Sequence, residues 1–250
     1  MSIQKSEAIL LTKRDIRETS SIAEFYTKDF GKIKGLIKGV RGPQAKFGIY
    51  LHEFAKFDIV FYDKRKADTY MITQCDLLNP YTEIAEDLDK RLNAFYVIEL
   101  VDKFTPLGDK CTELYHLLEW VLGRICKERF SDREIIKFGF KLLENAGFLP
   151  QFGQCVKCSG DISKDTRFSV RLAGLLCANC HNADIQAMPL SRGAISSINM
   201  IVRQGIEKLH NLAISNSISK ELQSLLERFI AYHLGEHINT TDFIRQAAIL

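Results

Sequence analysis

Residues 31–46 read GKIKGLIKGVRGPQAK, and the first half of this segment alternates between apolar and polar residues. Alternation with period two is typical of a β-strand that has one buried face. Ile33 and Ile37 fall on that face, which Gly35 and Gly39 interrupt. Glycine weakens a strand unless the sheet bends there or another backbone comes close. Both conditions are met in a small closed barrel, so the segment predicts such a barrel.

The same alternation runs through residues 6–77, where turn residues separate runs of β-branched and aromatic residues. The pattern predicts five strands, at about 6–12, 21–27, 32–40, 51–61 and 68–77. A longer loop is expected at 41–49 and a hairpin tip at 63–66. Five short antiparallel strands favour the five-stranded oligonucleotide-binding barrel, or OB-fold.

After residue 80 the apolar period changes to three and four, which indicates amphipathic helices. Thr82 is expected to cap the first helix. Another is expected to begin at the capping box formed by Ser131 and Glu134 and to end at Gly147. Further helices are predicted at about 110–128, 191–203 and 218–234. Together these helices predict a bundle.

Four of the seven cysteines form the pattern C-x2-C-x18-C-x2-C, at Cys155, Cys158, Cys177 and Cys180. Two such pairs are typical of a tetrahedral zinc site. Four thiolates leave no open coordination position, so one structural Zn²⁺ is the expected cofactor. The segment FSVRLAGLL, residues 168–176, is expected to form a short hairpin that joins the two pairs, and Gly160 is expected to permit the tight turn after the first.

Other interpretations of the cysteines stay open. The four could be buried core residues without metal, and His181, next to Cys180, could replace one ligand. Cys75, Cys111 and Cys126 lie on apolar faces and are expected to be small core residues. No secretory signal precedes them, so we expect reduced thiols and a cytoplasmic protein.

Positive charge is concentrated near the N-terminus. Residues 28–66 hold ten cations and four acids, whereas the whole chain carries only +3. Such a local field favours a polyanionic partner. The residues expected to contact nucleic acid are Lys32, Lys34, Lys38, Arg41, Lys46, Lys64, Arg65 and Lys66. The first three share one face of the strand at 32–40.

Aromatic residues near this strand are candidates for stacking on bases, namely Tyr26, Phe30, Phe47 and Tyr50. The alternative for the lysines is a solvated edge that keeps a barrel soluble. A solubility edge usually mixes charges of both signs, whereas residues 31–52 contain no acid. Nucleic acid is therefore the favoured partner.

The sequence contains no phosphate-binding glycine loop, no HExxH or GxSxG motif and no clustered carboxylates suited to Mg²⁺. It also contains no run of eighteen uncharged apolar residues. We therefore expect a binding protein that is neither an enzyme nor a membrane protein.

Three segments carry a likeness to known proteins: AILLTKRDIRETSSIAEFYTKDFGKIKGLIKGVRG at residues 8–42, FLPQFGQCVKC at 148–158 and FSVRLAGLLCANC at 168–180. Through them the sequence resembles the RecO family of bacterial recombination mediators. It implies an α+β multidomain protein, with an OB-fold barrel followed by a helical bundle and an inserted four-cysteine zinc finger. The expected domains are 1–80 (barrel), 81–152 (helices), 153–183 (finger) and 184–250 (helices).

The resemblance further implies a DNA-repair mediator of the RecF pathway, associated with the nucleoid. Such proteins bind single- and double-stranded DNA and the partner RecR. They engage the C-terminal tail of single-strand-binding protein, anneal strands and assist RecA loading, and they act indirectly with RecF.

Two other functions remain open. In the first, a zinc-ribbon RNA- or transcription-associated protein, the finger itself contacts nucleic acid through Lys157, Arg167 and Arg171. In the second, the protein is a metal-dependent nucleic-acid enzyme, which the missing carboxylate cluster disfavours.

Overall fold

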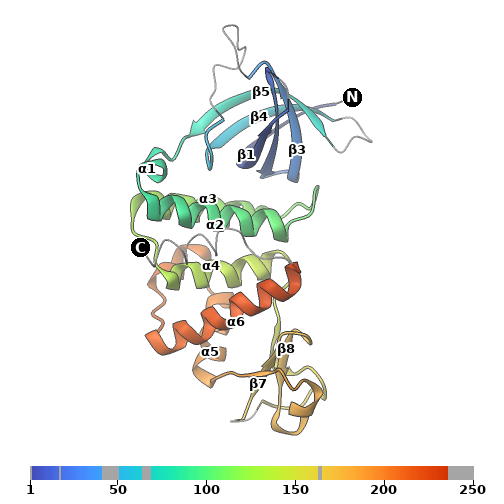
Figure 1. The fold of residues 1–250 in the computed structure, drawn as a ribbon, viewed down its shortest axis with the longest axis vertical. Helices are drawn as coiled ribbons and strands as arrows, with labels where there is room; N and C mark the ends of the chain where they lie inside the picture. The colour runs from blue at the N-terminus through green and yellow to red at the C-terminus, as the bar shows by residue number, and fades with distance from the viewer. Residues whose placement is uncertain (1, 17, 41–50, 64–68, 163–164, 236–250) are drawn as a thin grey trace. The chain divides into compact units, whose positions relative to one another are not determined.

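The computed structural model describes residues 2–16, 18–40, 51–63, 69–162 and 165–235. Within these ranges the chain forms two compact units, which meet in sequence between residues 129 and 130 (Figure 1). Each unit is described by itself. The sequence predicts boundaries between folding modules at residues 80, 152 and 183, and these boundaries stay a prediction. None of the helices in the described ranges has the length and apolar content needed to cross a membrane.

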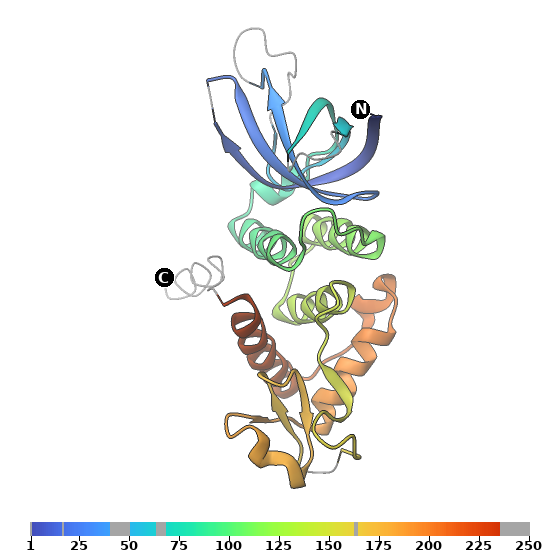
Figure 2. The same cartoon turned by 90° about the vertical axis from the view of Figure 1, so that its right-hand side faces the viewer.

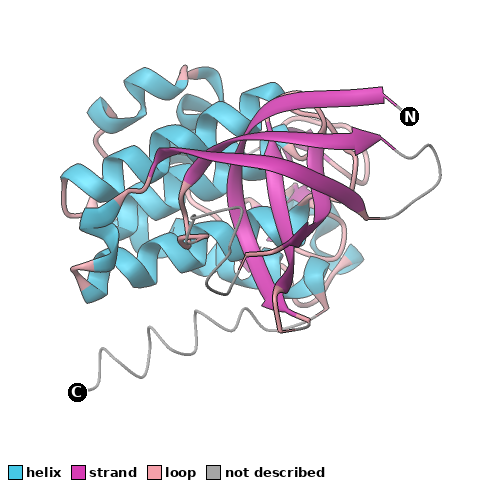
Figure 3. Cartoon of the chain, turned by 90° about the horizontal axis from the view of Figure 1, so that it is seen from above, coloured by secondary structure: helices cyan, strands magenta, loops and turns pink. Residues whose placement is uncertain are grey.

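The first unit begins with a closed five-stranded barrel, in the strand order β1-β2-β3-β5-β4. Its strands are β1 (Ser2–Asp15), β2 (Ser20–Thr27), β3 (Gly31–Lys38), β4 (Lys56–Asp63) and β5 (Tyr70–Asn79). Figure 3 shows these strands curving around a common centre. The predicted OB-fold barrel is confirmed, although β4 begins five residues later than expected.

One strand pair differs from the all-antiparallel expectation. β3 and β5 run parallel, with Gly35 opposite Tyr70 and Ile37 opposite Ile72. This pair closes the ring between strands that are not consecutive in sequence. A Cβ atom on Gly35 would lie 2.5 Å from Cγ1 of Ile72. Glycine is therefore needed where β5 packs over β3, as the sequence pattern suggested.

The barrel interior is an apolar core. Phe25 and Phe57 make an edge-to-face contact there, with ring centroids 6.1 Å apart. Alternate residues of every strand point inward, and Cys75 is among them, which confirms its expected core role. Burial raises the pKa of the Cys75 thiol to about 12. Its thiol is therefore held neutral at physiological pH.

Among the described residues of the first unit, three helices follow the barrel: α1 (Thr82–Ala85), α2 (Leu88–Phe104) and α3 (Thr112–Lys127). Figure 2 shows α2 and α3 side by side. The expectation of one helix capped by Thr82 is wrong. The long helix is capped by Asp87, whose carboxylate accepts a hydrogen bond from the backbone N–H of Lys90 at 3.0 Å. The Asp87 carboxylate thus accepts from a backbone N–H that has no partner within the first helical turn, so a new helix begins there.

In the part of the second unit that the structure describes, three helices pack against one another: α4 (Asp132–Asn145), α5 (Arg192–Arg203) and α6 (Asn216–Leu234). The capping box of Ser131 and Glu134 is present, and Gly147 follows α4 with φ +76°. Two short 3-10 turns, η1 (Ala178–Ala183) and η2 (Ile206–Asn211), join the other elements. The predicted helices are confirmed to within a few residues.

A four-stranded sheet belongs to the same unit, in the order β6-β8-β7-β9. Its strands are β6 (Gln151–Cys155), β7 (Arg167–Ser169), β8 (Gly174–Leu176) and β9 (Met188–Pro189). β7 and β8 form the predicted hairpin. Phe168 joins the sheet to the helices, because its ring lies 5.6 Å from that of Phe152 and 6.2 Å from that of Phe229.

Candidate nucleic-acid interface and metal centre

The four cysteines of the repeated pattern converge in the second unit. The Sγ atoms of Cys155, Cys158, Cys177 and Cys180 all lie within 4.8 Å of one another. The Cys158 and Cys177 sulfurs are 3.7 Å apart. A tetrahedral ion with metal–sulfur bonds of about 2.3 Å requires sulfurs about 3.8 Å apart. The donor set and its spacing therefore fit one zinc ion.

The local backbone explains why the first pair of thiols converges. Ser159 has φ +56°, and its N–H donates to the carbonyl of Cys155 at 2.8 Å. The Cys155 N–H in turn donates to the carbonyl of Gly160 at 3.0 Å. The prediction that Gly160 permits the tight turn is wrong, because the residue with a left-handed backbone conformation in this turn is Ser159. A Cβ on Gly160 would lie 3.3 Å from the Cys158 sulfur, so glycine leaves room for that ligand.

Electrostatics at the cluster favour a cation. Burial acts to raise the pKa of Cys155, but backbone N–H groups of Cys177, Cys158 and Lys157 outweigh it and lower that pKa to about 6. Hydrogen bonds with Cys158 and Cys177 raise the pKa of Cys180 to about 12. Crowded thiols thus resist joint ionisation, and a divalent ion supplies the positive charge that four thiolates require.

The structure also shows where His181, Cys111 and Cys126 lie, and so tests the expectations for these three residues. His181 hydrogen-bonds through Nε2 to the Asp165 carbonyl at 2.7 Å and is not part of the sulfur cluster. Cys111 is the N-cap residue of α3 and is half-buried. Cys126 Sγ lies 2.9 Å from a Glu83 carboxylate oxygen. The expectation that both are core residues is wrong, because each lies at a helix end beside a polar group.

The described lysines of the predicted DNA-binding set share the outward face of β3. Lys32, Lys34 and Lys38 alternate with buried residues that point into the barrel. Lys38 is exposed, and Lys34 is partly exposed beside Glu24, with 3.9 Å between Nζ and Oε1. An exposed ion pair of this length contributes little to stability. Both lysines therefore remain available to an anion.

Lys32 does not remain available, which corrects the expectation of three free ammonium groups in a line. Its Nζ donates to the main-chain oxygen of Asp102 at 2.6 Å and lies 3.1 Å from Oδ1 of the same residue. Its side chain is only 12% exposed. The segment after α2 covers this end of β3, and Gly108 N–H donates to the Lys32 carbonyl at 2.8 Å. Lys32 thus joins the helices to the barrel.

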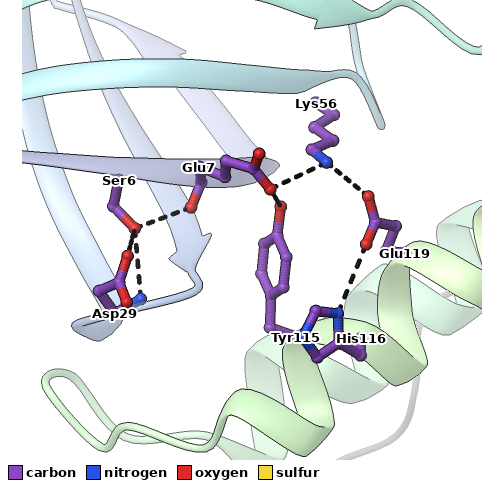
Figure 4. Close-up of polar contacts among 7 residues, drawn as sticks. All are labelled: Ser6, Glu7, Asp29, Lys56, Tyr115, His116 and Glu119. Atoms are coloured by element: carbon purple, nitrogen blue, oxygen red, sulfur yellow. Dashed lines mark hydrogen bonds and ion pairs between the residues drawn. The ribbon is translucent and has the colours of Figure 1, made fainter.

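A second lysine is withdrawn from the basic region in the same way (Figure 4). Lys56 Nζ lies 3.0 Å from Glu7 and 2.5 Å from Glu119 of α3. The Tyr115 hydroxyl donates to Glu7 at 3.3 Å. Burial acts to lower the pKa of Lys56, but its hydrogen bonds to Glu119 and Glu7 raise it overall. This cation stabilises the first unit from within.

The aromatic residues proposed for stacking are placed differently from the expectation. Tyr26 is fully buried, and its hydroxyl donates to the Cys111 carbonyl at 3.3 Å. Phe30 packs edge-on against Phe61 of the barrel core, with centroids 5.2 Å apart. The Tyr26 ring is therefore closed to a base, whereas Phe30 is partly buried against the core. Phe47 and Tyr50 lie outside the described residues.

The other predicted DNA contacts fall on parts of the chain outside the described residues, namely Arg41, Lys46, Lys64, Arg65 and Lys66. One cation that the sequence analysis omitted lies on the barrel. Arg14 of β1 is exposed and stands opposite Ile22 of β2 in the strand register. The alternation of apolar and polar residues in β1 indicates that Arg14 faces outward. A bulge between Leu10 and Thr12 shifts the register, so this position is hard to assign from the sequence.

The finger residues of the rival interpretation are spread over the small sheet. Lys157 is exposed between the first two cysteines, and Arg167 is half-buried in β7. Arg171 donates through Nη2 to the Ala183 carbonyl at 2.6 Å. The hydrogen bond of Arg171 joins the β7–β8 turn to η1, and the Arg171 side chain remains exposed.

Comparison with known proteins agrees with this architecture. The family "Recombination protein O N terminal" matches residues 1–81, and "Recombination protein O C terminal" matches residues 85–242. The DNA repair protein RecO of Desulforamulus reducens is 31% identical, over 98% of this chain and 94% of that protein. The RecO protein of Thermoanaerobacter sp. is 29% identical, over 98% of both chains. The chain therefore belongs to the RecO family of DNA repair and recombination proteins.

Proposed function

We propose that this protein is a recombination mediator whose barrel holds the sugar-phosphate backbone of DNA. The observation that carries the proposal is the outward face of β3, where Lys34 and Lys38 remain accessible while Lys32 is withdrawn. Arg14 adds a third accessible cation on β1. These cations belong to the strand-rich face that OB-folds use for oligonucleotides.

The mechanism follows from counterion release. Each cation that neutralises a phosphate releases condensed counterions, so affinity falls as salt rises. Contacts to phosphates position a strand without reading its bases. A protein that holds two strands in this way leaves their bases free to pair. Annealing is then driven by base pairing itself, and no enzymatic step is required of the protein.

We further propose one structural zinc ion, held by Cys155, Cys158, Cys177 and Cys180. A closed four-thiolate site stabilises its fold and offers no position for substrate. The helices and finger of the second unit would then serve as a scaffold for protein partners. By family resemblance these partners are RecR, the single-strand-binding protein tail and, indirectly, RecA and RecF. The proposed location is the cytoplasm, at the nucleoid.

The DNA-binding site is tested with the double variant Lys34→Met/Lys38→Met. Removing two phosphate contacts should reduce the slope of log affinity against log salt by about 2 for duplex DNA. The matched control is Lys208→Met/Lys220→Met, two exposed lysines of the second unit, which should leave the slope unchanged. An unchanged slope in the β3 double variant would exclude the proposed site.

The rival finger interface is tested with Lys157→Met/Arg171→Met in the same titration. If this variant loses DNA or RNA binding while the β3 variant keeps it, the finger is the nucleic-acid site. The mediator role requires a separate assay, in which recombinase loads onto DNA coated with single-strand-binding protein. The protein should relieve the inhibition by that coat, and failure to do so would refute mediation while leaving DNA binding intact.

A further inference from the structure

The cysteines of this chain differ in how much solvent reaches them. All seven lie in the described ranges, and the structure contains them as free thiols. Three are buried and three are partly buried, and only Cys158 is exposed. A reagent dissolved in water therefore meets the sulfur of Cys158 first.

The three cysteines outside the four-sulfur cluster are held as neutral thiols. Burial raises the pKa of Cys75 to about 12. Burial and a hydrogen bond to Glu83 raise the pKa of Cys126 to about 11, and burial also raises the pKa of Cys111. The thiolate, and not the thiol, is the form that attacks an electrophile. At neutral pH these three cysteines therefore react slowly with an oxidant.

The four cysteines of the cluster are thiolates whenever zinc is bound, because a thiol must lose its proton to coordinate the ion. Within the cluster, Cys155 is 0% exposed and Cys177 is 8% exposed, and both belong to the apolar core of the finger. Cys180 packs against that core. Cys158 lies in the turn that follows β6, where both adjacent residues are exposed as well. Cys158 is thus the metal-held thiolate that solvent reaches most easily.

A second sulfur stands close enough to Cys158 to complete a disulfide. The Sγ atoms of Cys158 and Cys177 are 3.7 Å apart. A disulfide bond is about 2.05 Å long, so the two sulfurs must approach by about 1.7 Å. Cys177 directly follows β8, so its position is fixed by the sheet. The movement therefore falls to the turn that carries Cys158.

We propose that Cys158 is the residue that hydrogen peroxide oxidises in this protein, and that Cys177 then forms a disulfide with it and so opens the metal site. The Cys158 thiolate attacks one peroxide oxygen, the O–O bond breaks and hydroxide leaves, which gives a sulfenic acid. The Cys177 thiolate attacks that sulfur, the S–S bond forms and a second hydroxide leaves. The two sulfurs together lose two electrons, which the peroxide accepts, and two protons from solvent convert the hydroxides to water.

The disulfide removes two of the four zinc ligands. Cys155 and Cys180 remain, and two thiolates do not complete the tetrahedral shell, so the ion dissociates. Binding free energy at a structural site is folding free energy, so the second unit loses stability. The barrel keeps its own core, in which the neutral thiol of Cys75 is buried. The inference rests on the zinc ion of the proposed function, and it adds reversible control of that ion by an oxidant.

The test treats the zinc-loaded protein with hydrogen peroxide and compares it with an untreated sample. Three quantities are followed: zinc release to a chromogenic chelator, the number of free thiols, and the position of the disulfide by mass spectrometry of peptides. One zinc ion should leave for each disulfide formed, and the free thiols should fall from seven to five. The disulfide should join Cys158 to Cys177. Dithiothreitol with added zinc should restore the melting temperature of the untreated protein.

Two histidine variants separate the attacking thiol from the metal ligand. Histidine can replace one cysteine as a zinc ligand, so Cys158→His and Cys180→His should each keep one zinc ion. Cys158→His should release the ion at least about fivefold more slowly than the unaltered protein, because the accessible thiolate is gone. Cys180→His is the matched control and should release it at the unaltered rate. Cys111→Ser/Cys126→Ser should also keep that rate, because neither thiol takes part.

The zinc content before oxidation separates the ways in which the inference can fail. If the protein binds no zinc under reducing conditions, the proposed metal centre itself is refuted. If the protein binds zinc but retains it in peroxide, or forms its first disulfide without Cys158, the inference is refuted and the metal centre stands. Release from Cys158→His at the unaltered rate refutes the inference in the same way. If Cys158→His binds no zinc, the disulfide position in the unaltered protein decides on these terms.

Discussion

Lys32 of β3 donates to the main-chain oxygen of Asp102 at 2.6 Å and lies 3.1 Å from the carboxylate of the same residue. This contact divides the β3 lysines into two kinds. Lys32 is a tether between barrel and helix, whereas Lys38, six residues further along β3, is exposed. Residues of one type on one face of one strand therefore have different roles.

Replacing the tether should cost stability and not DNA affinity. Lys32→Met leaves Asp102 without its cation, so unfolding should become easier by about 1–3 kcal/mol. Lys38→Met is the matched control, with an unchanged melting temperature and a salt slope lower by about 1. Thermal melts and salt titrations of both variants make the comparison. A normal melting temperature for Lys32→Met, with a reduced salt slope, would return Lys32 to the DNA interface.

Zinc removal should destabilise the second unit and spare DNA binding by the barrel. Binding free energy at a structural site is folding free energy, so chelation should lower the melting temperature and release one zinc ion per chain. Cys158→Ala should give the same result. His181→Ala should retain the ion, because His181 bonds to Asp165 instead. If the metal-free protein melts at the temperature of the zinc-loaded protein, the ion has no structural role.

Glu7 should make stability depend on pH in the acid range. The hydrogen bond from Lys56 holds the pKa of the Glu7 carboxyl below its ordinary value of 4.5. The folded chain therefore binds this proton at lower pH than the unfolded chain does. The stabilisation is complete above the ordinary pKa and is lost as pH falls through the lowered one.

The measurement is the melting temperature between about pH 7 and pH 3. Glu7→Gln should be less stable than the unaltered protein at neutral pH, and the difference should shrink towards pH 3. Gln keeps the size of the side chain, so packing is matched. A constant difference across the range would show that the carboxylate charge is not the stabilising feature.

Gly35 should not tolerate a side chain. An added Cβ would lie 2.5 Å from Cγ1 of Ile72, so Gly35→Ala should destabilise the first unit by about 1–3 kcal/mol. Gly123 of α3 has nothing within 4 Å of such an atom. Gly123→Ala should instead stabilise by about 0.5–1 kcal/mol, because alanine suits a helix interior better than glycine. Equal effects of the two changes in denaturant titrations would contradict the closure of the barrel at β3 and β5.

Local patterns were sufficient to predict most of the elements and the cluster of four cysteines. Alternation of apolar residues identified the five strands, since a strand with one buried face must repeat with period two. Cys155, Cys158, Cys177 and Cys180 were found because each pair lies within one turn, so spacing alone brings its thiols together. The capping box at Ser131 was found for the same reason, since its two partners are three residues apart.

Long-range partners were not predictable in this way. Nothing in the sequence near Lys32 or Tyr26 shows that residues 102–111 would cover them, because those contacts join residues about seventy to eighty-five positions apart. The same holds for Lys56 and Glu119. Lys32 was assigned to an outward face correctly, but that face was assumed to meet solvent.

The sequence by itself determined the strands, the helices and the four thiols, because these depend on neighbours within a few residues. The tertiary structure alone decided which lysines of β3 are paired, as Lys32 is with Asp102, and which stay accessible, as Lys38 does. The physical reason is that chain closure sets the strand register and the placement of the covering helix. Both arise from contacts between segments that are distant in sequence.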